Sequence, residues 1–328
     1  MHVEDLFRQF EFTKVAVLGD VMLDTYCWGH VERISPEAPV PVVTLDKREY
    51  RIGGAGNVAL NIASLGAPVA VFSIIGKDDE GVILQSLFEK NNIDASNLIK
   101  SRERITTSKA RILSRKQQMI RLDSETTNDL GPSEEKNLIQ SIERFVEKEK
   151  PQVLILEDYN KGVLTEKVIR SVIDLCRRNH IITTVDPKRK NFFSYQGADI
   201  FKPNLKEVQE GLNIHLEKLD LSSLRDIHLR LSERLAHHIS FITLSEKGVF
   251  CQENQQAALF PSHFRNISDV SGAGDTVIAV ASLVYAATKN AFLMAEIANI
   301  AGGLVCEEVG TAAIDRERLL RECSLLLE

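Results

Sequence analysis

Four short runs of apolar, mostly β-branched residues are the feature of this chain that most restricts its fold. They are separated by segments in which apolar residues recur at helical spacing. The runs cover 15–18, 69–75, 153–156 and 181–185, and the helical patterns cover 57–65, 81–90, 134–149 and the segment after Thr165. Ser133 and Thr165 are the expected N-caps of the last two helices. Strands that alternate with helices pair in parallel through right-handed crossovers, which predicts one α/β domain over residues 1–328.

Two segments interrupt this alternation, at about 26–52 and 105–122. Both contain short strand-like runs without a helix between them. They predict either a small β-flap over the main sheet or simple surface excursions.

The charge balance and the cysteines argue against several kinds of partner. A net charge of −6 does not suit nucleic acid, which usually requires a basic surface. The five cysteines lie far apart without a C-x-x-C pair, so neither a disulfide framework nor a zinc site is expected. The first residues are acidic and no apolar stretch reaches about 18 residues, so we expect a cytoplasmic protein without a membrane partner.

The sequence 269–276, Asp-Val-Ser-Gly-Ala-Gly-Asp-Thr, directly precedes an apolar helical pattern. Small residues at a helix start leave backbone N–H groups free to bind an anion, and the helix dipole favours negative charge there. The carboxylate of Asp275 could then accept a proton from an attacking hydroxyl while Gly272, Ala273 and Gly274 stabilise a transferring phosphoryl group. The alternative is a helix start with glycines for close packing and an acid that complements the dipole.

A second glycine cluster, Gly53-Gly54-Ala55-Gly56-Asn57-Val58-Ala59, formally matches the dinucleotide fingerprint G-x-G-x-x-A. However, residues 48–52 make a poor buried strand, whereas that fingerprint follows the first core strand. The backbone exposed by Gly53 and Gly54 could instead lie against a sugar, with Asn57 bonding to its hydroxyls. A tight turn into a helix is the alternative.

No Walker A pattern is present, so ATP would have to be held by other segments. Asn204 and Glu207 stand three apart at a helix start, where their oxygens could bind Mg²⁺ that keeps several waters. A capping box is the alternative for this pair. Lys247 lies between two strand-like runs, either in a plain hairpin turn or facing a nucleotide phosphate.

Polar residues follow several of the expected strands. Asp20 and Asp24 follow the first, residues 157–162 follow the third, and residues 186–188 follow the fourth. Because the carboxyl ends of parallel strands meet at one edge of a sheet, these loops should form one ligand cleft.

Both glycine motifs, about 220 residues apart with Pro203-Asn204-x-x-Glu207 between them, resemble the ribokinase-like (PfkB) family of carbohydrate kinases. The resemblance implies a Rossmann-like α/β/α sandwich with a small β lid, use of ATP and Mg²⁺, and a homodimer formed through the lid. It implies that Asp275 is the general base and that Asn204 and Glu207 organise Mg²⁺, largely through water. The residues implied to lie near the nucleotide are Ser245, Lys247, Gly248 and Asn299, and those implied to bind the sugar are Asp20, Asp24, Gly53, Gly54 and Asn57. A monovalent cation near Asp269 is a further expectation.

Within the family, the segments 19–26, 33–42 and 158–162 resemble the kinases of heptose 7-phosphate. This implies phosphorylation of the anomeric O1 of D-glycero-D-manno-heptose 7-phosphate to the 1,7-bisphosphate, a step towards lipopolysaccharide core precursors. The 7-phosphate needs cations, for which Arg111, Lys161 and Lys188 are candidates, with Asp158 beside them. The chain has no H-x-G-H pattern of a nucleotidyltransferase, so only kinase activity is expected. The alternatives are a kinase of another sugar, a non-catalytic sugar or nucleotide binder, and a dinucleotide enzyme.

Overall fold

The four apolar runs form strands of one nine-stranded sheet in the computed structural model, which describes residues 2–114, 117–216, 218–263 and 265–327. Its strand order is β13-β12-β11-β10-β9-β8-β1-β4-β5. All neighbours from β5 to β11 are parallel, and only β12 and β13 are antiparallel. The bounds are β1 Val15–Gly19, β4 Val69–Gly76, β5 Leu98–Ser101, β8 Val153–Glu157, β9 Ile182–Asp186, β10 Ile200–Phe201, β11 Ile239–Thr243, β12 Val249–Glu253 and β13 Gln256–Phe260.

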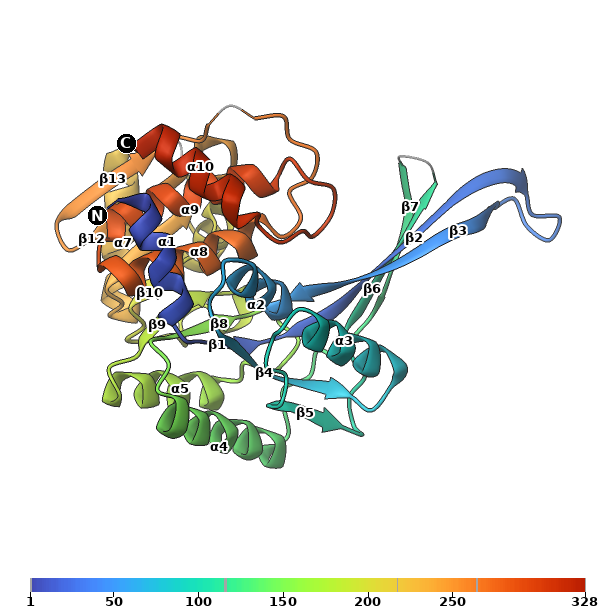
Figure 1. Cartoon of the computed structure of the whole chain (residues 1–328), viewed down its shortest axis with the longest axis horizontal. Helices are drawn as coiled ribbons and strands as arrows, with labels where there is room; N and C mark the ends of the chain where they lie inside the picture. Colours follow the sequence, from blue (N-terminus) through green and yellow to red (C-terminus); the bar gives the residue numbers. More distant parts are fainter. Residues whose placement is uncertain (1, 115–116, 217, 264, 328) are drawn as a thin grey trace.

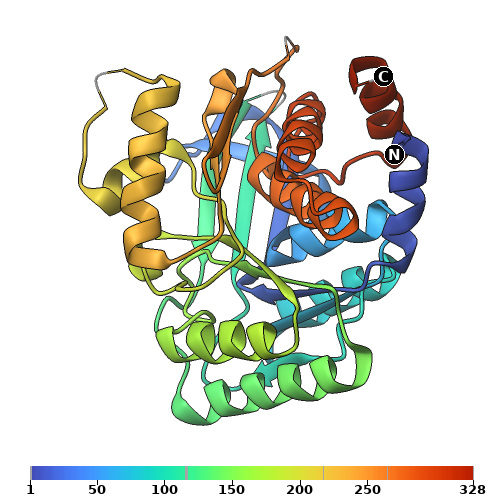
Figure 2. The ribbon, with the colours of Figure 1, turned by 90° about the vertical axis from the view of Figure 1, so that its left-hand side faces the viewer.

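Helices cover both faces of this sheet (Figure 2). Because successive residues of a strand point to opposite faces, Val15 and Val17 of β1 join one hydrophobic core while Ala16 and Leu18 join the other. The helices of the first core are α1 Val3–Gln9, α2 Ala55–Ser64, α3 Asp79–Lys90, α8 Ala273–Thr288, α9 Ala291–Val305 and α10 Arg316–Leu327. Those of the second are α4 Pro132–Glu149, α5 Glu166–Arg178, α6 Leu205–Leu212 and α7 Leu221–Leu235. Single 3₁₀ turns lie at Phe10–Phe12, Arg189–Asn191 and Ser245–Lys247.

A second sheet of four strands, in the order β3-β2-β6-β7, reaches away from the main body (Figure 1). Its strands are β2 Val21–Ile34, β3 Pro41–Gly54, β6 Ser108–Ser114 and β7 Gln117–Ser124. The chain passes from β1 through Asp20 into β2 and returns from β3 directly into α2. These strands lie largely within the two interrupting segments of the sequence, but β2 begins earlier and β3 ends later than expected, so the sheet includes Asp24, Gly53 and Gly54.

The expected α/β/α sandwich with a small additional sheet is confirmed. Thr165 caps α5 as predicted, since its side chain accepts a hydrogen bond from the Val168 N–H. The prediction for Ser133 is wrong. Gly131 is the N-cap of α4 and Pro132 occupies its first turn, where the fixed φ of proline suits a helix and its missing N–H costs nothing. In the described ranges no helix is both long and apolar enough to cross a membrane.

Candidate active site

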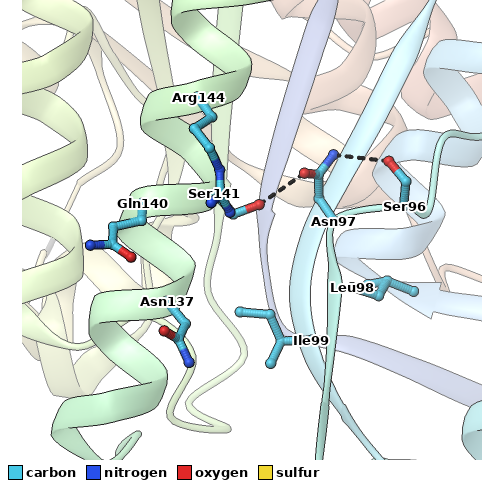
Figure 3. Close-up of a pocket in the computed structure, with 8 residues that line it drawn as sticks. All are labelled: Ser96, Asn97, Leu98, Ile99, Asn137, Gln140, Ser141 and Arg144. Carbon is cyan, nitrogen blue, oxygen red and sulfur yellow. Dashed lines mark hydrogen bonds between the residues drawn. The ribbon is translucent and has the colours of Figure 1, made fainter.

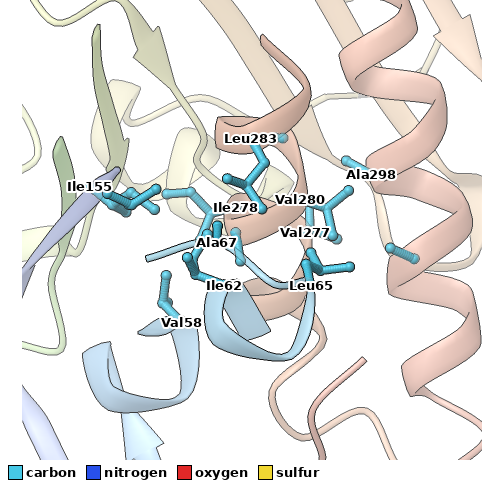
Figure 4. Packing of buried hydrophobic residues seen from close by; sticks show 14 of the residues in the cluster. Val58, Ile62, Leu65, Ala67, Ile155, Val277, Ile278, Val280, Leu283 and Ala298 are labelled. Atoms are coloured by element: carbon cyan, nitrogen blue, oxygen red, sulfur yellow. The ribbon is translucent and has the colours of Figure 1, made fainter. Parts of the chain in front are cut away.

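The two glycine motifs lie side by side because the helices that follow them pack together. Val58 and Ile62 of α2 and Val277 and Val280 of α8 are fully or almost fully buried in the same core (Figure 4). This packing brings the first turns of both helices to the same place, although they are more than 200 residues apart in the chain. Gly53 and Gly54 end a strand of the second sheet and do not follow the first core strand, so their position is not that of the Rossmann fingerprint.

Asp275 lies in the first turn of α8 and is 3% exposed. Its Oδ2 accepts a hydrogen bond from Asn57 Nδ2 (2.8 Å), and its Oδ1 accepts one from the Tyr159 hydroxyl (2.7 Å). Burial raises the pKa of Asp275 to about 6, and the two hydrogen bonds oppose this shift because they stabilise the carboxylate. The side chain is therefore ionised at neutral pH and basic enough to accept a proton.

Gly272 is the N-cap of α8 and has a φ of 80°. A Cβ at this position would lie 2.7 Å from Asn57 Nδ2, the atom that donates to Asp275. A side chain would therefore strain the backbone and displace a partner of the carboxylate. The glycine motif thus serves both the helix start and the position of Asp275.

A cluster of buried charges adjoins the first turn of α8. Asp186, at the end of β9, pairs with Lys202 (2.7 Å) and Lys188 (3.2 Å), and Lys188 also pairs with Glu207 (2.8 Å). Burial raises the pKa of Asp186, but the two lysines outweigh it and the pKa is lower than usual. A Cβ built on Gly274 would lie 3.7 Å from Asp186 Oδ2 and from Lys202 Nζ, so this cluster faces the glycine loop. The ammonium group of Lys202 thus lies close to the expected anion hole.

Asn204 and Glu207 form a capping box at the start of α6. Asn204 Oδ1 accepts from the Glu207 N–H (2.9 Å), and Glu207 Oε2 accepts from the Asn204 N–H (2.8 Å). The alternative prediction, that these two residues form a capping box, is therefore confirmed. Each of these oxygens has two lone pairs and uses one in the box, so the pair also fits a magnesium ion bound through water.

The four residues expected near the nucleotide gather around the segment 260–262. Ser245 and Lys247 lie in the 3₁₀ turn that joins β11 to β12, which is the predicted hairpin. A Cβ on Gly248 would overlap the Phe260 carbonyl oxygen, and Asn299 Nδ2 donates to the Pro261 carbonyl (2.9 Å). These residues therefore share one edge of the main sheet, and none of their hydrogen bonds within the described residues leads to Asp275.

Asp20 and Asp158, both expected to bind the acceptor, hold the loop that carries Tyr159. The carboxylate of Asp20 accepts from the N–H groups of Tyr159 (2.8 Å), Lys161 (3.0 Å) and Val163 (3.1 Å). Asp158 accepts from the Asn160 N–H and the Tyr195 hydroxyl, each at 2.7 Å. Burial raises the pKa of Asp158 to about 6. These two carboxylates therefore order the loop.

Asp24, which was predicted to bind the sugar, lies at the base of the second sheet. It is buried, and its Oδ1 pairs with Arg111 Nη1 at 2.6 Å. A Cβ on Gly53 would lie 2.5 Å from Asp24 Oδ2, so only glycine allows β3 to pass so close. The neighbouring Gly54 leads directly into α2 and Asn57.

Asp269, the expected neighbour of a monovalent cation, accepts three hydrogen bonds. Its Oδ1 takes the N–H (2.9 Å) and hydroxyl (2.8 Å) of Ser271, and its Oδ2 takes the Gly310 N–H (2.9 Å). The carboxylate thereby ties the glycine loop to the segment that follows α9.

Sequence reasoning missed Tyr159, Lys202 and Lys109 as individual site residues. Tyr159 lies inside the motif 158–162 and Lys202 directly precedes Pro203-Asn204, so the motifs themselves were the available signal. Lys109 lies in β6, and its Nζ is 5.6 Å from the centre of the Tyr159 ring. No local pattern marked it.

A separate hollow of about 280 Å³ lies between β5 and α4 (Figure 3). Asn97 and Ser141 are hydrogen-bonded across it (2.8 Å), and Arg144 is the only charged residue of its lining. It contains no carboxylate or other general base, so it does not compete with the Asp275 site.

Residues 13–318 match the sequence family of pfkB family carbohydrate kinases. The chain belongs to this family. It is therefore an ATP-dependent carbohydrate kinase, and the resemblance found in the glycine motifs is confirmed.

Curated relatives share more than a third of the aligned residues. The bifunctional protein HldE of Geobacter sulfurreducens is 38% identical over 318 residues, and that of Aliarcobacter butzleri is 39% identical over 298 residues. These alignments cover 95% and 91% of this chain but 63% and 62% of the relatives. The chain thus spans less than two thirds of their length.

Solved structures of low sequence identity share the fold. Phosphofructokinase-2 from Escherichia coli in complex with potassium has a TM-score of 0.77 at 16% identity, covering 95% of this chain and 98% of that one. Arabidopsis thaliana ribokinase complexed with ribose and ATP has a TM-score of 0.72 at 14% identity, covering 94% and 99%. The ribokinase-like fold of this chain is thereby confirmed.

Proposed function

We propose that this kinase phosphorylates the anomeric O1 of D-glycero-D-manno-heptose 7-phosphate to the 1,7-bisphosphate, as a step towards lipopolysaccharide core precursors. The observation that carries the catalytic part is the Asp275 carboxylate, fixed by Asn57 and Tyr159 at the start of α8. The heptose part is supported by the motifs at 19–26, 33–42 and 158–162 and by the likeness to proteins named HldE.

Asp275 acts as the general base in this proposal. Oδ1 is the atom that receives the proton: the acceptor hydroxyl takes the place of the Tyr159 hydroxyl, whose side chain turns aside while Asp20 holds its backbone. Asn57 keeps Oδ2 fixed meanwhile, so the carboxylate does not turn away. The deprotonated oxygen then attacks the γ-phosphorus, the bond to the β,γ-bridging oxygen breaks, and ADP leaves.

The N–H groups of 272–274 and the ammonium group of Lys202 beside them stabilise the transferring group in this proposal. These donors are positioned before the reaction, which makes them effective against the negative charge of the phosphoryl group. Asn204 and Glu207 would hold Mg²⁺ through water, and bound Mg²⁺ would neutralise charge on the phosphate oxygens. Ser245, Lys247, Gly248 and Asn299 would line the nucleotide, with a monovalent cation beside Asp269.

Acceptor selectivity tests this proposal. ADP release should be measured with heptose 7-phosphate, fructose phosphates, ribose and nucleosides at equal concentration. We expect the highest kcat/KM for heptose 7-phosphate. A higher kcat/KM for another sugar would mean that this sugar is the acceptor. Binding of a sugar without any release of ADP would favour a non-catalytic sugar-binding protein.

The pH dependence should report the ionisation of Asp275. A general base works only when it has lost its proton, so log(kcat/KM) should fall below the Asp275 pKa of about 6 and stay level above it. In Tyr159→Phe the hydrogen bond that lowers this pKa is gone, so the acid limb should move to higher pH. Initial rates between pH 5 and 8 measure both effects. An acid limb at the same pH in both proteins would contradict this role of Tyr159.

We also propose that two copies associate through the second sheet. Its edge strand β7 exposes Met119, Ile120 and Leu122, which are 41%, 51% and 52% exposed. Apolar residues on an edge strand favour pairing with a second sheet. Ile120→Lys should therefore shift the mass measured by light scattering from dimer to monomer, whereas Leu229→Lys, at an exposed site of α7, should not. A monomeric wild-type protein would contradict the proposal.

A further inference from the structure

Basic side chains gather around Tyr159 and the base of the second sheet, and most of them already have a carboxylate partner. Their pairs are Arg111–Asp24 (2.6 Å), Lys161–Glu125 (2.7 Å) and Lys188–Glu207 (2.8 Å). These three cations are the ones that the sequence offered for the substrate phosphate. In each case an added anion would have to compete with a carboxylate that is already in place.

Lys109 differs from these three. It lies in β6 between Asp24 of β2 and Asp123 of β7 in the strand register, yet its ammonium group pairs with neither. Within the described part of the chain, the ammonium group of Lys109 makes no hydrogen bond or ion pair, and it lies over the face of the Tyr159 ring, 5.6 Å from the ring centre. The side chain is partly buried, so this charge is partly removed from bulk water and has no carboxylate in ion-pair contact.

The charges that act on Lys109 come from β2, from β7 and from the loop that carries Tyr159. Asp24 and Asp123 attract it, while Lys161 and Arg121 repel it. Burial lowers the pKa of Lys109 because it disfavours the charged form. Arg121 is itself paired with Asp123 (2.8 Å), which leaves Lys109 as the surplus positive charge of this group.

Tyr159 connects Lys109 to the catalytic carboxylate. Its hydroxyl donates to Asp275 and its ring lies beneath the Lys109 ammonium group. The Asp275 carboxylate and the Lys109 ammonium group thus approach two parts of the same side chain, its hydroxyl and the face of its ring. An acceptor whose reacting hydroxyl takes the place of the Tyr159 hydroxyl would therefore extend its far end towards Lys109.

We propose that Lys109 binds the phosphate monoester of the acceptor sugar and so selects phosphorylated sugars over free ones. The inference rests on the proposed function and adds the residue that sets substrate class. A dianionic phosphate supplies the counter-ion that Lys109 lacks, and a partly buried ammonium group binds it more strongly than an exposed one does. A free sugar would leave this charge unpaired.

The test compares Lys109→Met with the wild type and with Lys100→Met. Lys100 is an exposed lysine of β5, outside the site. With heptose 7-phosphate as acceptor, Lys109→Met should raise KM about 10- to 100-fold, since a hydrogen bond to a charged group is lost. The KM for ATP and the KM for free heptose should not change, and Lys100→Met should behave as wild type. Lys109→Arg should recover much of the loss because it restores the charge.

Two outcomes would overturn the assignment. One is an unchanged KM for heptose 7-phosphate in Lys109→Met, and the other is an equal rise for free and phosphorylated heptose. If the wild type itself fails to phosphorylate any sugar phosphate, the proposed function is wrong, which is distinguishable from a failure of Lys109 alone. Thermal unfolding of each variant separates loss of binding from loss of folded protein.

Discussion

Replacing Asp275 with Asn should lower kcat by about 10²- to 10⁴-fold, the usual cost of removing a general base. Asn keeps the size of the side chain but cannot accept the proton of the acceptor hydroxyl. The glycine loop and the lysines at Asp186 are untouched, so ATP should bind with nearly unchanged affinity. Steady-state kinetics and ATP titration of the same preparation measure both quantities.

The matched control is Asp79→Asn. Asp79 is an exposed acid in the first turn of α3 and thus has the position that the purely structural interpretation gives to Asp275. If first-turn acids act only on the helix dipole, both variants should lose about 0.3–1 kcal/mol of stability and keep their activity. Full activity of Asp275→Asn would therefore contradict the mechanism, whereas loss of activity confined to Asp275→Asn supports it.

The fold was predictable wherever a segment carries its own periodic signal. The runs at 15–18 and 153–156 are apolar throughout because both faces of their strands are buried, and this feature alone indicates a parallel sheet. Helix starts were less reliable. Ser133 is an acceptable cap in isolation, but Pro132 before it begins the helix. The second sheet had no such signal, because its strands are half exposed and pair with segments far along the chain.

The sequence predicted the motifs that make up the site, but not which of their residues are hydrogen-bonded or ion-paired to one another. Asp275 and Asn57 were each marked by a glycine loop, yet their hydrogen bond joins residues 218 apart and depends on the packing of α2 against α8. The same limit applies to the cations. Lys188 was a reasonable phosphate ligand in the sequence, and only the structure shows that Asp186 and Glu207 already hold it.

Asn204 and Glu207 illustrate why a motif can support two interpretations at once. The hydrogen bonds of the capping box fix both side chains at the start of α6. A side chain that is fixed in this way loses little further conformational entropy when it binds a ligand, so the capping box would favour ligand binding by the same residues. The presence of the box therefore does not count against the magnesium role.

Lys202→Met should lower the free energy of unfolding by about 3–5 kcal/mol, because it leaves a buried carboxylate without one of its partners. Lys202 and Asp186 are 3% and 4% exposed, and their Nζ and Oδ2 atoms are 2.7 Å apart. Lys188 lies at 3.2 Å and still pairs with Asp186, but it is shared with Glu207. Urea unfolding at pH 7 measures the loss.

Three comparisons make this prediction sharp. Lys190→Met breaks an ion pair with Asp129 that is about half exposed, so it should cost at most about 1 kcal/mol. Asp186→Asn combined with Lys202→Met should be more stable than Lys202→Met alone, because the unpaired charge is gone.

The pKa of Asp186 is lowered in the wild type, so the stability contributed by its pairing is present above the unfolded pKa and is lost as the pH falls through the folded value. The difference between wild type and Lys202→Met should therefore be largest at neutral pH and shrink at acid pH, where Asp186 of the variant takes up a proton and no longer leaves an unpaired charge. A difference that is independent of pH would mean that Lys202 acts through packing and not through the charge of Asp186.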